Sequence, residues 1–236
     1  FPPGGASDIV GRQLARRLTE VMGSTFVVDN KAGAATTIGA TYVARAPKDG
    51  YTLLLSAGST FTVTPHLMDK LQYKLEDFAP VAAVATVPFA FVVKKDFPAK
   101  SVAQYVAYAK ANPGKVSYGS FGLGSSAHLA GEAFKVATGV NMVHVPYKGA
   151  AEVIPAMVGG QIQAVITSPN QALPFIKQGK IRALGTSAPK RMAQLPDVPT
   201  YEEQGVKGLE TNVWFGIFAP GKTPAPILQT LADQID

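Results

Sequence analysis

The sequence predicts an α/β protein made of two lobes. Segments with helical periodicity alternate with short apolar segments along the whole chain, a pattern typical of parallel sheets covered by helices. The alternation starts again in the middle of the chain, and two long apolar segments, near residues 82–95 and 211–220, do not fit its rhythm. We therefore expect two strands that cross between the lobes. Lobe 1 then comprises residues 1–86 and 216–236, and lobe 2 comprises residues 87–215.

The helices are predicted from apolar residues that recur on one face. In the first helix, Val10, Leu14 and Leu18 share a face, and Gly23 supplies a stop signal. Similar patterns recur between the apolar segments. The predicted helices cover residues 7–23, 35–46, 101–114, 125–139, 149–160, 169–180, 199–205 and 223–235.

The strands are predicted from short apolar runs that glycine, proline and polar residues interrupt. PKDG at residues 47–50 is a turn before the second run, and Val87-Pro88 joins two runs within residues 78–95. The predicted strands cover residues 25–29, 51–56, 78–87, 88–95, 115–120, 141–147, 162–168, 181–187 and 210–220.

The composition is that of a globular protein and excludes several kinds of site. Of the 236 residues, 47% are hydrophobic and 16% are charged, and no apolar run reaches the roughly 18 residues of a membrane helix. The absence of cysteine excludes disulfides and thiol catalysis, and the spacing of the three histidines does not favour a metal site. The net charge of +6 is spread along the chain, which argues against nucleic-acid binding and suits a small anionic ligand.

The first predicted helix follows a proline- and glycine-rich turn, FPPGGASD, at residues 1–8. Gly4 and Gly5 permit unusual backbone angles, and we expect Ser7 to cap the helix with Asp8 in its first turn. Free N–H groups at a helix start beside such a turn suit an anion. An ordinary capped turn between a strand and a helix has the same sequence features, so both interpretations stay open.

A second glycine-rich turn, YGSFGLGSSAHLAGE, covers residues 118–132. Ser125 and Ser126 stand at the predicted helix start, and their hydroxyl groups suit a carboxylate or phosphate. His128 falls in the first turn, where it either contacts a ligand or has a structural role.

Two more turns have this character. NKAGAATTIG contains Gly33 and Thr36, and HVPYKGAAE contains Tyr147 and Lys148 before a helix that begins near Gly149. Ligands of open α/β sheets bind at the carboxyl ends of the strands. Two lobes that carry such turns would clamp an anion from both sides.

Catalytic motifs are weak in this sequence. YGSFG resembles the hydrolase pattern G-x-S-x-G, but Tyr118 replaces the first glycine. The phosphate-binding pattern G-x-x-x-x-G-K-[ST] does not occur. Ser125 and His128 are close in sequence, which alone does not define a nucleophile and its base. We therefore expect no catalytic residue and no cofactor.

Several long motifs resemble a known family. FPPGGASDIVGRQLARRL, NKAGAATTIGA, KANPGKVSYGSFGLGSSAHLAGEAFK, VHVPYKGAAEVIPAMVGGQI and WFGIFAPGKTPAPI are similar to segments of the solute receptors of tripartite tricarboxylate transporters, also called Bug receptors. This resemblance implies the type II periplasmic-binding-protein fold, in which two lobes joined by two crossing strands close like a Venus flytrap on a small organic anion. Family members carry a first strand before FPPGG and continue past the helix begun at Thr223, so it also implies a chain truncated at both ends.

The resemblance assigns ligand-binding residues position by position. They are Pro3, Gly4, Gly5, Ser7, Asp8, Ser59, Thr60, Gly124, Ser125, Ser126, His128, Tyr147, Lys148, Gly149, Thr167 and Ser168. Many members carry an aspartate where this chain has Thr167, and that carboxylate can pair with the ammonium group of an amino-acid ligand. Thr167 cannot form this ion pair, which favours dicarboxylates, tricarboxylates or aromatic carboxylates. Trp214 and Phe215 in the last crossing strand are interpreted mainly as hinge and core residues; the alternative is a wall against an aromatic ligand.

The function implied by the resemblance is that of a monomeric periplasmic receptor. It binds a small organic carboxylate in the cleft between its lobes and delivers it to the membrane permease subunits of the transporter, without a cofactor, a metal or nucleic acid. Two alternatives stay open. The first is a ligand sensor that feeds a signalling protein, and the second is a hydrolase on the same fold that uses Ser125 or Ser126 with His128.

Overall fold

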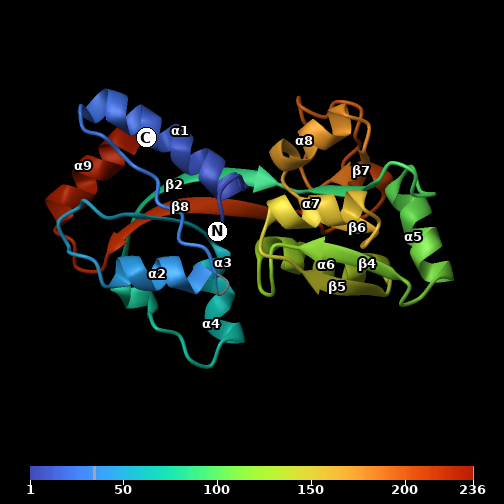
Figure 1. The fold of residues 1–236 in the computed structure, drawn as a ribbon, viewed down its shortest axis with the longest axis horizontal. Coiled ribbons are helices and arrows are strands. Elements are labelled where there is room, and N and C mark those ends of the chain that lie inside the picture. Colours follow the sequence, from blue (N-terminus) through green and yellow to red (C-terminus); the bar gives the residue numbers. More distant parts are fainter. Residues whose placement is uncertain (34–35, 236) are drawn as a thin grey trace. The chain divides into compact units, whose positions relative to one another are not determined.

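The computed structural model of the protein describes residues 1–33 and 36–235 (Figure 1). The chain divides into two compact units: unit 1 contains Phe1–Thr86 and Trp214–Asp236, and unit 2 contains Val87–Val213. The second boundary thus lies just before residue 214, whereas the sequence placed it after residue 215. Strands β2 (Phe78–Pro88) and β8 (Asn212–Pro220) carry the chain from one unit to the other.

Unit 1 is built on a three-stranded sheet with the order β1-β8-β2. Strand β1 runs antiparallel to β8, with Leu54 opposite Phe218 and Ala57 opposite Phe215. Helices α1 and α9 contact each other, as Figure 1 shows. The remaining elements of the unit are α1 (Ala6–Met22), α2 (Thr37–Ala44), β1 (Leu54–Ala57), α3 (Ser59–Thr62), α4 (Thr64–Leu67), the 3₁₀ helix η2 (Leu75–Asp77) and α9 (Ala225–Ile235).

Unit 2 is built on a five-stranded sheet with the order β5-β4-β6-β3-β7. Strand β4 is parallel to β5 and β6, whereas β3 is antiparallel to β6 and β7. Its elements are β3 (Ala90–Lys94), α5 (Val102–Ala111), β4 (Val116–Ser120), α6 (Ser126–Thr138), β5 (Met142–Pro146), α7 (Ala150–Val158), β6 (Ala164–Thr167), α8 (Pro169–Lys177), β7 (Ile181–Thr186) and the 3₁₀ helix η3 (Glu202–Gln204).

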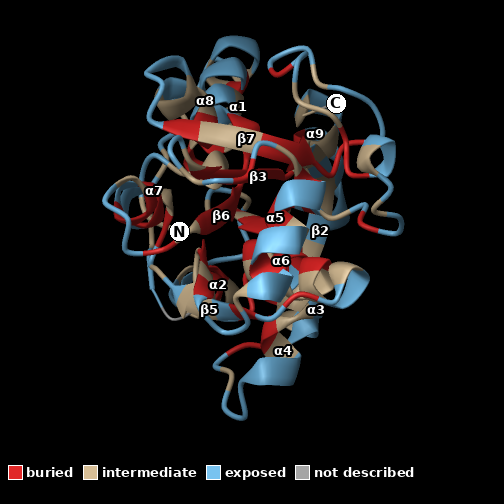
Figure 2. Cartoon of the chain, turned by 90° about the vertical axis from the view of Figure 1, so that its right-hand side faces the viewer, coloured by how far each residue is buried: buried red, intermediate tan, exposed pale blue. Residues whose placement is uncertain are grey.

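The sheet of unit 2 has a hydrophobic core on both faces. On one face, Val92 and Val165 pack with Ile154 and other apolar residues of α7 and α8. On the other face, the ring of Phe91 stacks on Phe134, with 4.7 Å between the ring centroids. Figure 2 shows the buried residues along β3 and β6 and the exposed outer surfaces of α5 and α6. Strands with helices on both sides are apolar on both faces, which explains the continuous apolar runs in the sequence.

The strand predicted at residues 25–29 is wrong. This segment forms no strand, because neither sheet of the described chain provides a neighbour for its backbone hydrogen bonds. Val27 is 83% exposed.

The structure corrects two other predictions. The predicted parallel pairing holds for β4, β5 and β6 but not for β3, which follows β2 without an intervening crossover helix. The sequence predicted no element between β1 and η2, where the short helices α3 and α4 lie. The helix predicted over residues 35–46 corresponds to α2 (Thr37–Ala44); its predicted first residue, Ala35, lies outside the described residues together with Ala34 of the third glycine-rich turn.

The start of α1 also differs from the prediction. The N-cap is Gly5, and Ser7 lies within the first turn. The carboxylate of Asp8 accepts a hydrogen bond from the backbone N–H of Gly4, at 3.0 Å from Oδ2, and thereby closes the turn in front of the helix. The prediction that Ser7 caps the helix is therefore wrong, because α1 has no side-chain cap and Asp8 bonds the backbone in front of it.

We expect a substitution of Gly131 by alanine to destabilise unit 2. A Cβ at this position of α6 would lie 2.1 Å from Cε2 of Tyr118, whose buried ring is held by a 2.7 Å hydrogen bond to Glu132. Such overpacking costs about 1–3 kcal/mol, so the urea midpoint should fall. Gly39→Ala is the control, because a Cβ in that helix meets only ordinary contacts at 3.5 Å. Equal midpoints for the two variants would contradict the prediction.

Candidate ligand-binding site

Three glycine- and serine-rich loops meet at one edge of the sheet in unit 2. They follow β5, β4 and β6, which are neighbours in the sheet and run parallel. Each loop leads directly into a helix, α7, α6 and α8 respectively. The unit 2 residues predicted to bind ligand lie in these loops, in the first turn of α6 or, for Thr167, at the end of β6. The structure therefore brings together segments that lie far apart in the sequence.

Close packing fixes the loops after β4 and β5. The backbone N–H of Tyr147 donates a 3.1 Å hydrogen bond to the carbonyl oxygen of Ser120, which joins the two loops. A Cβ on Gly119 would lie 2.3 Å from Val153 and 2.6 Å from Ile162. Because position 119 has no side chain, α7 can pack tightly against β4.

The loop before α6 is held by its own side chains. Ser125 is the N-cap of the helix, and its hydroxyl accepts from the backbone N–H of His128 at 3.2 Å and donates to the carbonyl oxygen of Gly122 at 2.8 Å. The backbone N–H of Gly124 donates to Nδ1 of His128 at 3.1 Å. Ser125, Gly124 and His128 therefore shape the loop, and the Ser126 hydroxyl has no partner among the described residues.

A second histidine, which the sequence analysis did not select, supports this loop. The rings of His128 and His144 stack with centroids 4.0 Å apart, and Nε2 of His144 lies 2.7 Å from the Ser120 hydroxyl. Burial and the neighbouring His128 lower the pKa of His144 to about 4, and burial also lowers the pKa of His128. The alternation of side chains along the strand could have indicated that His144 points inwards, because His144 lies on the same strand face as the buried Met142.

A serine hydroxyl bonded to a histidine could act as a nucleophile and its base, but Ser120 is not placed where a substrate could reach it. Ser120 is fully buried, and its hydroxyl also hydrogen-bonds with the backbone of Gly122. A nucleophile must reach a substrate atom. The pair is therefore suited to holding the loop.

The loop after β6 combines one satisfied hydroxyl and one free hydroxyl. Thr167 is fully buried and donates a 2.7 Å hydrogen bond to Oε1 of Gln171 in α8. Ser168 is 2% exposed, and its hydroxyl has no partner among the described residues. A buried hydroxyl without a partner is costly, so this group is suited to meeting a polar ligand atom.

The predicted residues of unit 1 lie in two segments, at the start of α1 and after β1. The carboxylate of Asp8 is paired with Arg12 at 3.0 Å, and this hydrogen bond lowers the pKa of Asp8. The hydroxyl of Thr60 lies 2.7 Å from those of Ser56 and Thr36. Asp8 and Thr60 are therefore bonded within the unit.

The remaining polar groups of the predicted set are free to bind a ligand. No described residue bonds the hydroxyls of Ser7 and Ser59, the phenol of Tyr147 or the ammonium group of Lys148. Together with Ser126 and Ser168, they are hydrogen-bond donors that no described residue engages. Pro3, Gly5 and Gly149 contribute only backbone to these turns.

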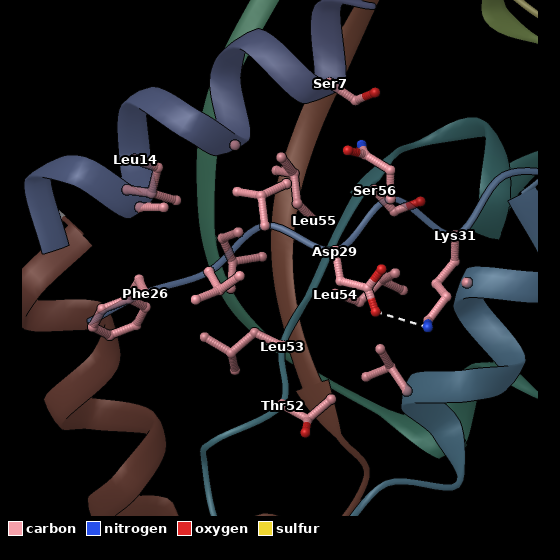
Figure 3. Close-up of a pocket in the computed structure, with 18 of the residues that line it drawn as sticks. Ser7, Leu14, Phe26, Asp29, Lys31, Thr52, Leu53, Leu54, Leu55 and Ser56 are labelled. Atoms are coloured by element: carbon pink, nitrogen blue, oxygen red, sulfur yellow. Dashed lines mark ion pairs between the residues drawn. The ribbon is translucent and has the colours of Figure 1, made fainter. Parts of the chain in front are cut away.

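A separate groove of about 330 Å³ lies in unit 1 between α1, residues 26–31 and β1 (Figure 3). Leu14, Phe26 and Leu53 line one side of it, and Ser7 and Ser56 lie on the other. Lys31 on its wall is paired with Asp29 at 2.7 Å. The groove is lined by polar as well as apolar residues, and the ammonium group of Lys31 is already paired with Asp29. Of its lining, we therefore assign only Ser7 to the candidate site.

The described residues contain no group of three histidine, aspartate or glutamate side chains placed to hold a metal ion. Across residues 1–33 and 36–235, no helix has both the length and the apolar character needed to cross a bilayer.

Two α/β units joined by two strands, with helix-initiating loops at one sheet edge, are the architecture of periplasmic binding proteins. Solved structures of this class are similar to the chain. The periplasmic binding protein BugD shares 36% identity with a TM-score of 0.91, over 100% of this chain and 79% of that one. An R. palustris protein solved with adipate shares 37% identity, with a TM-score of 0.95 and the same coverage. MatC of Rhodopseudomonas palustris, with bound malate, shares 30% identity with a TM-score of 0.90, over 100% and 80%.

The sequence relatives agree with these structures. The family described as "Tripartite tricarboxylate transporter family receptor" matches residues 10–236. The protein BugT of Bordetella pertussis is 38% identical over 238 aligned positions, which cover 100% of this chain and 73% of BugT. The chain belongs to the tripartite tricarboxylate transporter family of receptors, which confirms the resemblance and the fold predicted from sequence.

We expect acid to destabilise the protein through the stacked histidines. The folded state keeps His128 and His144 neutral at pH values where histidines of the unfolded chain, with a pKa of about 6.5, take up protons. The unfolded state then binds more protons, so the free energy of unfolding falls as the pH is lowered from about 6.5 towards 4.5. Glu132, Lys135 and Tyr118 face the pair and are the other titratable groups around it.

The measurement is the urea midpoint at several pH values between 7.5 and 4.5. His144→Gln should flatten this dependence, although it also removes the bond to Ser120. His66→Gln, at an exposed position of α4, controls for the loss of a histidine. The prediction is contradicted when His144→Gln keeps the wild-type dependence or when both variants flatten it equally.

Proposed function

We propose that this chain is a periplasmic receptor that captures a small organic carboxylate for a tripartite tricarboxylate-type transporter. The family to which the chain belongs consists of transporter receptors. Of the similar solved structures, one contains adipate and another contains malate. The observation that carries the proposal is the meeting of three helix starts, with free donors, at one sheet edge of unit 2. The receptor acts as a monomer and delivers its ligand to the permease subunits of the transporter.

The chemistry of this edge suits a carboxylate. Helices α6 and α7 direct their N-terminal ends towards it, and backbone N–H groups at such ends favour negative charge. Ser126, Tyr147 and Lys148 add two hydroxyl donors and an ammonium group. Hydrogen bonds to a charged partner are stronger than neutral ones, so these groups bind a carboxylate in preference to a neutral solute.

Our proposal also includes contacts from unit 1. Ser7 and Ser59 are its free hydroxyls near the loops that the family resemblance assigns to the ligand. A ligand that needs groups of both units favours the conformation in which both reach it. Binding would then shift an equilibrium between open and closed forms, which is the signal a permease reads.

The ligand class follows from the loop after β6. The Thr167 hydroxyl is committed to Gln171, and position 167 has no carboxylate to pair with an ammonium group. Desolvating an ammonium group without a counter-charge is unfavourable. We therefore propose dicarboxylates, tricarboxylates or aromatic carboxylates as ligands. We propose no catalytic role, since Ser120, which pairs with His144, is fully buried.

A thermal-shift screen tests the function directly. The purified chain is heated with malate, succinate, citrate, adipate, benzoate, terephthalate, aspartate or glutamate at saturating concentration. A ligand at about 100 times its Kd adds roughly 2.7 kcal/mol of stability, so a clear rise in Tm is expected for at least one acid without an ammonium group. A rise for aspartate and glutamate alone would contradict the ligand class, and no rise for any acid would contradict the function.

We expect Ser126→Ala to weaken carboxylate binding without changing the stability of the free protein. The Ser126 hydroxyl has no partner in the folded chain, and a hydrogen bond to a charged group is worth about 1.5–3 kcal/mol. Calorimetric titration should show a loss of affinity of about tenfold or more. Ser24→Ala, at an exposed position in unit 1, is the control. Unchanged affinity in Ser126→Ala would remove this residue from the site.

Lys148 can be tested in the same way against a matched lysine. Lys148→Gln removes the free ammonium group at the start of α7, whereas Lys115→Gln lowers the net charge equally at an exposed position of the same unit. Only Lys148→Gln should reduce affinity, and its effect should weaken as salt is added. Equal losses for both variants would indicate a general charge effect.

A further inference from the structure

Trp214 is the single tryptophan of the chain and lies on β8, where the chain enters unit 1. Its neighbours Val213 and Phe215 are buried, at 7% and 3% exposure, but Trp214 is 38% exposed. Strand alternation therefore points the indole away from the core. The interpretation of this strand as core packing fits Phe215 and does not account for Trp214.

The position of the indole is fixed by a glycine. The backbone N–H of Gly58 donates a 3.0 Å hydrogen bond to the carbonyl oxygen of Trp214. A Cβ on Gly58 would lie 2.1 Å from Cε2 and 2.2 Å from Nε1 of the ring. Gly58 has φ −54°, which any residue can adopt, so the backbone does not require a glycine there. The ring itself occupies the space of a side chain at position 58.

This contact places the indole on a loop of the proposed site. Gly58 directly precedes Ser59, whose hydroxyl is free, and Thr60, whose hydroxyl is held by Ser56. The exposed part of the ring is thus rigidly attached to the segment that presents Ser59. The indole Nε1 also has no hydrogen-bond partner among the described residues.

We propose that Trp214 is a specificity residue of the carboxylate site. Its exposed face packs against the apolar body of the ligand, a methylene chain or an aromatic ring. The receptor should therefore prefer carboxylates with such a body to short hydroxylated acids such as malate and citrate. An exposed aromatic ring loses unfavourable contact with water when an apolar group covers it, and a hydroxylated chain gains less from this contact. This inference rests on the proposed function and narrows its ligand class.

The single tryptophan allows a direct test. Its fluorescence is recorded while the purified chain is titrated with adipate, terephthalate, malate and citrate. Adipate and terephthalate should change the emission and bind at least about tenfold more tightly than malate and citrate. Affinities are confirmed by calorimetry, which does not depend on the ring.

Variants separate the role in specificity from a general role in folding. Trp214→Ala should weaken adipate and terephthalate binding by about tenfold and change malate and citrate binding by less than about threefold. Trp214→Phe should retain most of the preference, because it keeps an apolar ring. Tyr51→Ala, at a 92% exposed tyrosine of unit 1, is the control, and urea midpoints report whether each variant is folded.

The outcomes distinguish this inference from the function on which it rests. Equal loss for all four acids in Trp214→Ala, or wild-type affinity for adipate and terephthalate, overturns the role of Trp214 and leaves the receptor function standing. A wild-type preference for malate or citrate overturns it as well. Binding of no carboxylate by the wild type overturns the function, and the inference with it. When Trp214→Ala does not fold, Trp214→Gln replaces it, with the same expected losses for the four acids and the same outcomes that overturn the inference.

Discussion

The parallel pairing of β4 with β5 on one side and β6 on the other is the constraint on which unit 2 depends. It places the carboxyl ends of three strands at one edge, so that α6, α7 and α8 all begin there. The pairing is supported from within the sheet, because Gly119 leaves the space that Val153 and Ile162 occupy. Residues outside the proposed site thus determine where its side chains lie.

Four of the predicted ligand segments contain two adjacent side chains with different roles. One is hydrogen-bonded within the protein and holds the turn, and its neighbour has no partner among the described residues. The pairs, with the bonded residue first, are Asp8 and Ser7, Thr60 and Ser59, Ser125 and Ser126, and Thr167 and Ser168. Loops that are ordered before the ligand arrives lose little conformational freedom on binding, which favours affinity. The same loops are neutral in charge, apart from Asp8 and Lys148, so backbone N–H groups carry much of the attraction for an anion.

The sequence predicted what is local and missed what depends on distant partners. Long amphipathic helices such as α1 and α6 were found, because their periodicity and glycine stops lie within the segment itself. The turns before helices were found for the same reason. The strand at residues 25–29 failed because a strand needs a neighbour, which its own sequence cannot supply. The hydrogen bond between Ser120 and His144 could not be predicted from the sequence either, because these residues lie in different strands and meet only when β4 pairs with β5.

The contact between Gly58 and Trp214 also limits how relatives of this chain can diverge. Any side chain at position 58 would enter the volume of the indole, so a larger residue there is compatible only with a smaller one at position 214. The two positions are therefore expected to covary. A paired exchange, such as Gly58→Ala with Trp214→Leu, would remove the clash at position 58 while replacing the flat ring with a smaller branched side chain. Such an exchange could change the shape of the surface that Trp214 presents to the proposed ligand, either during evolution or by design.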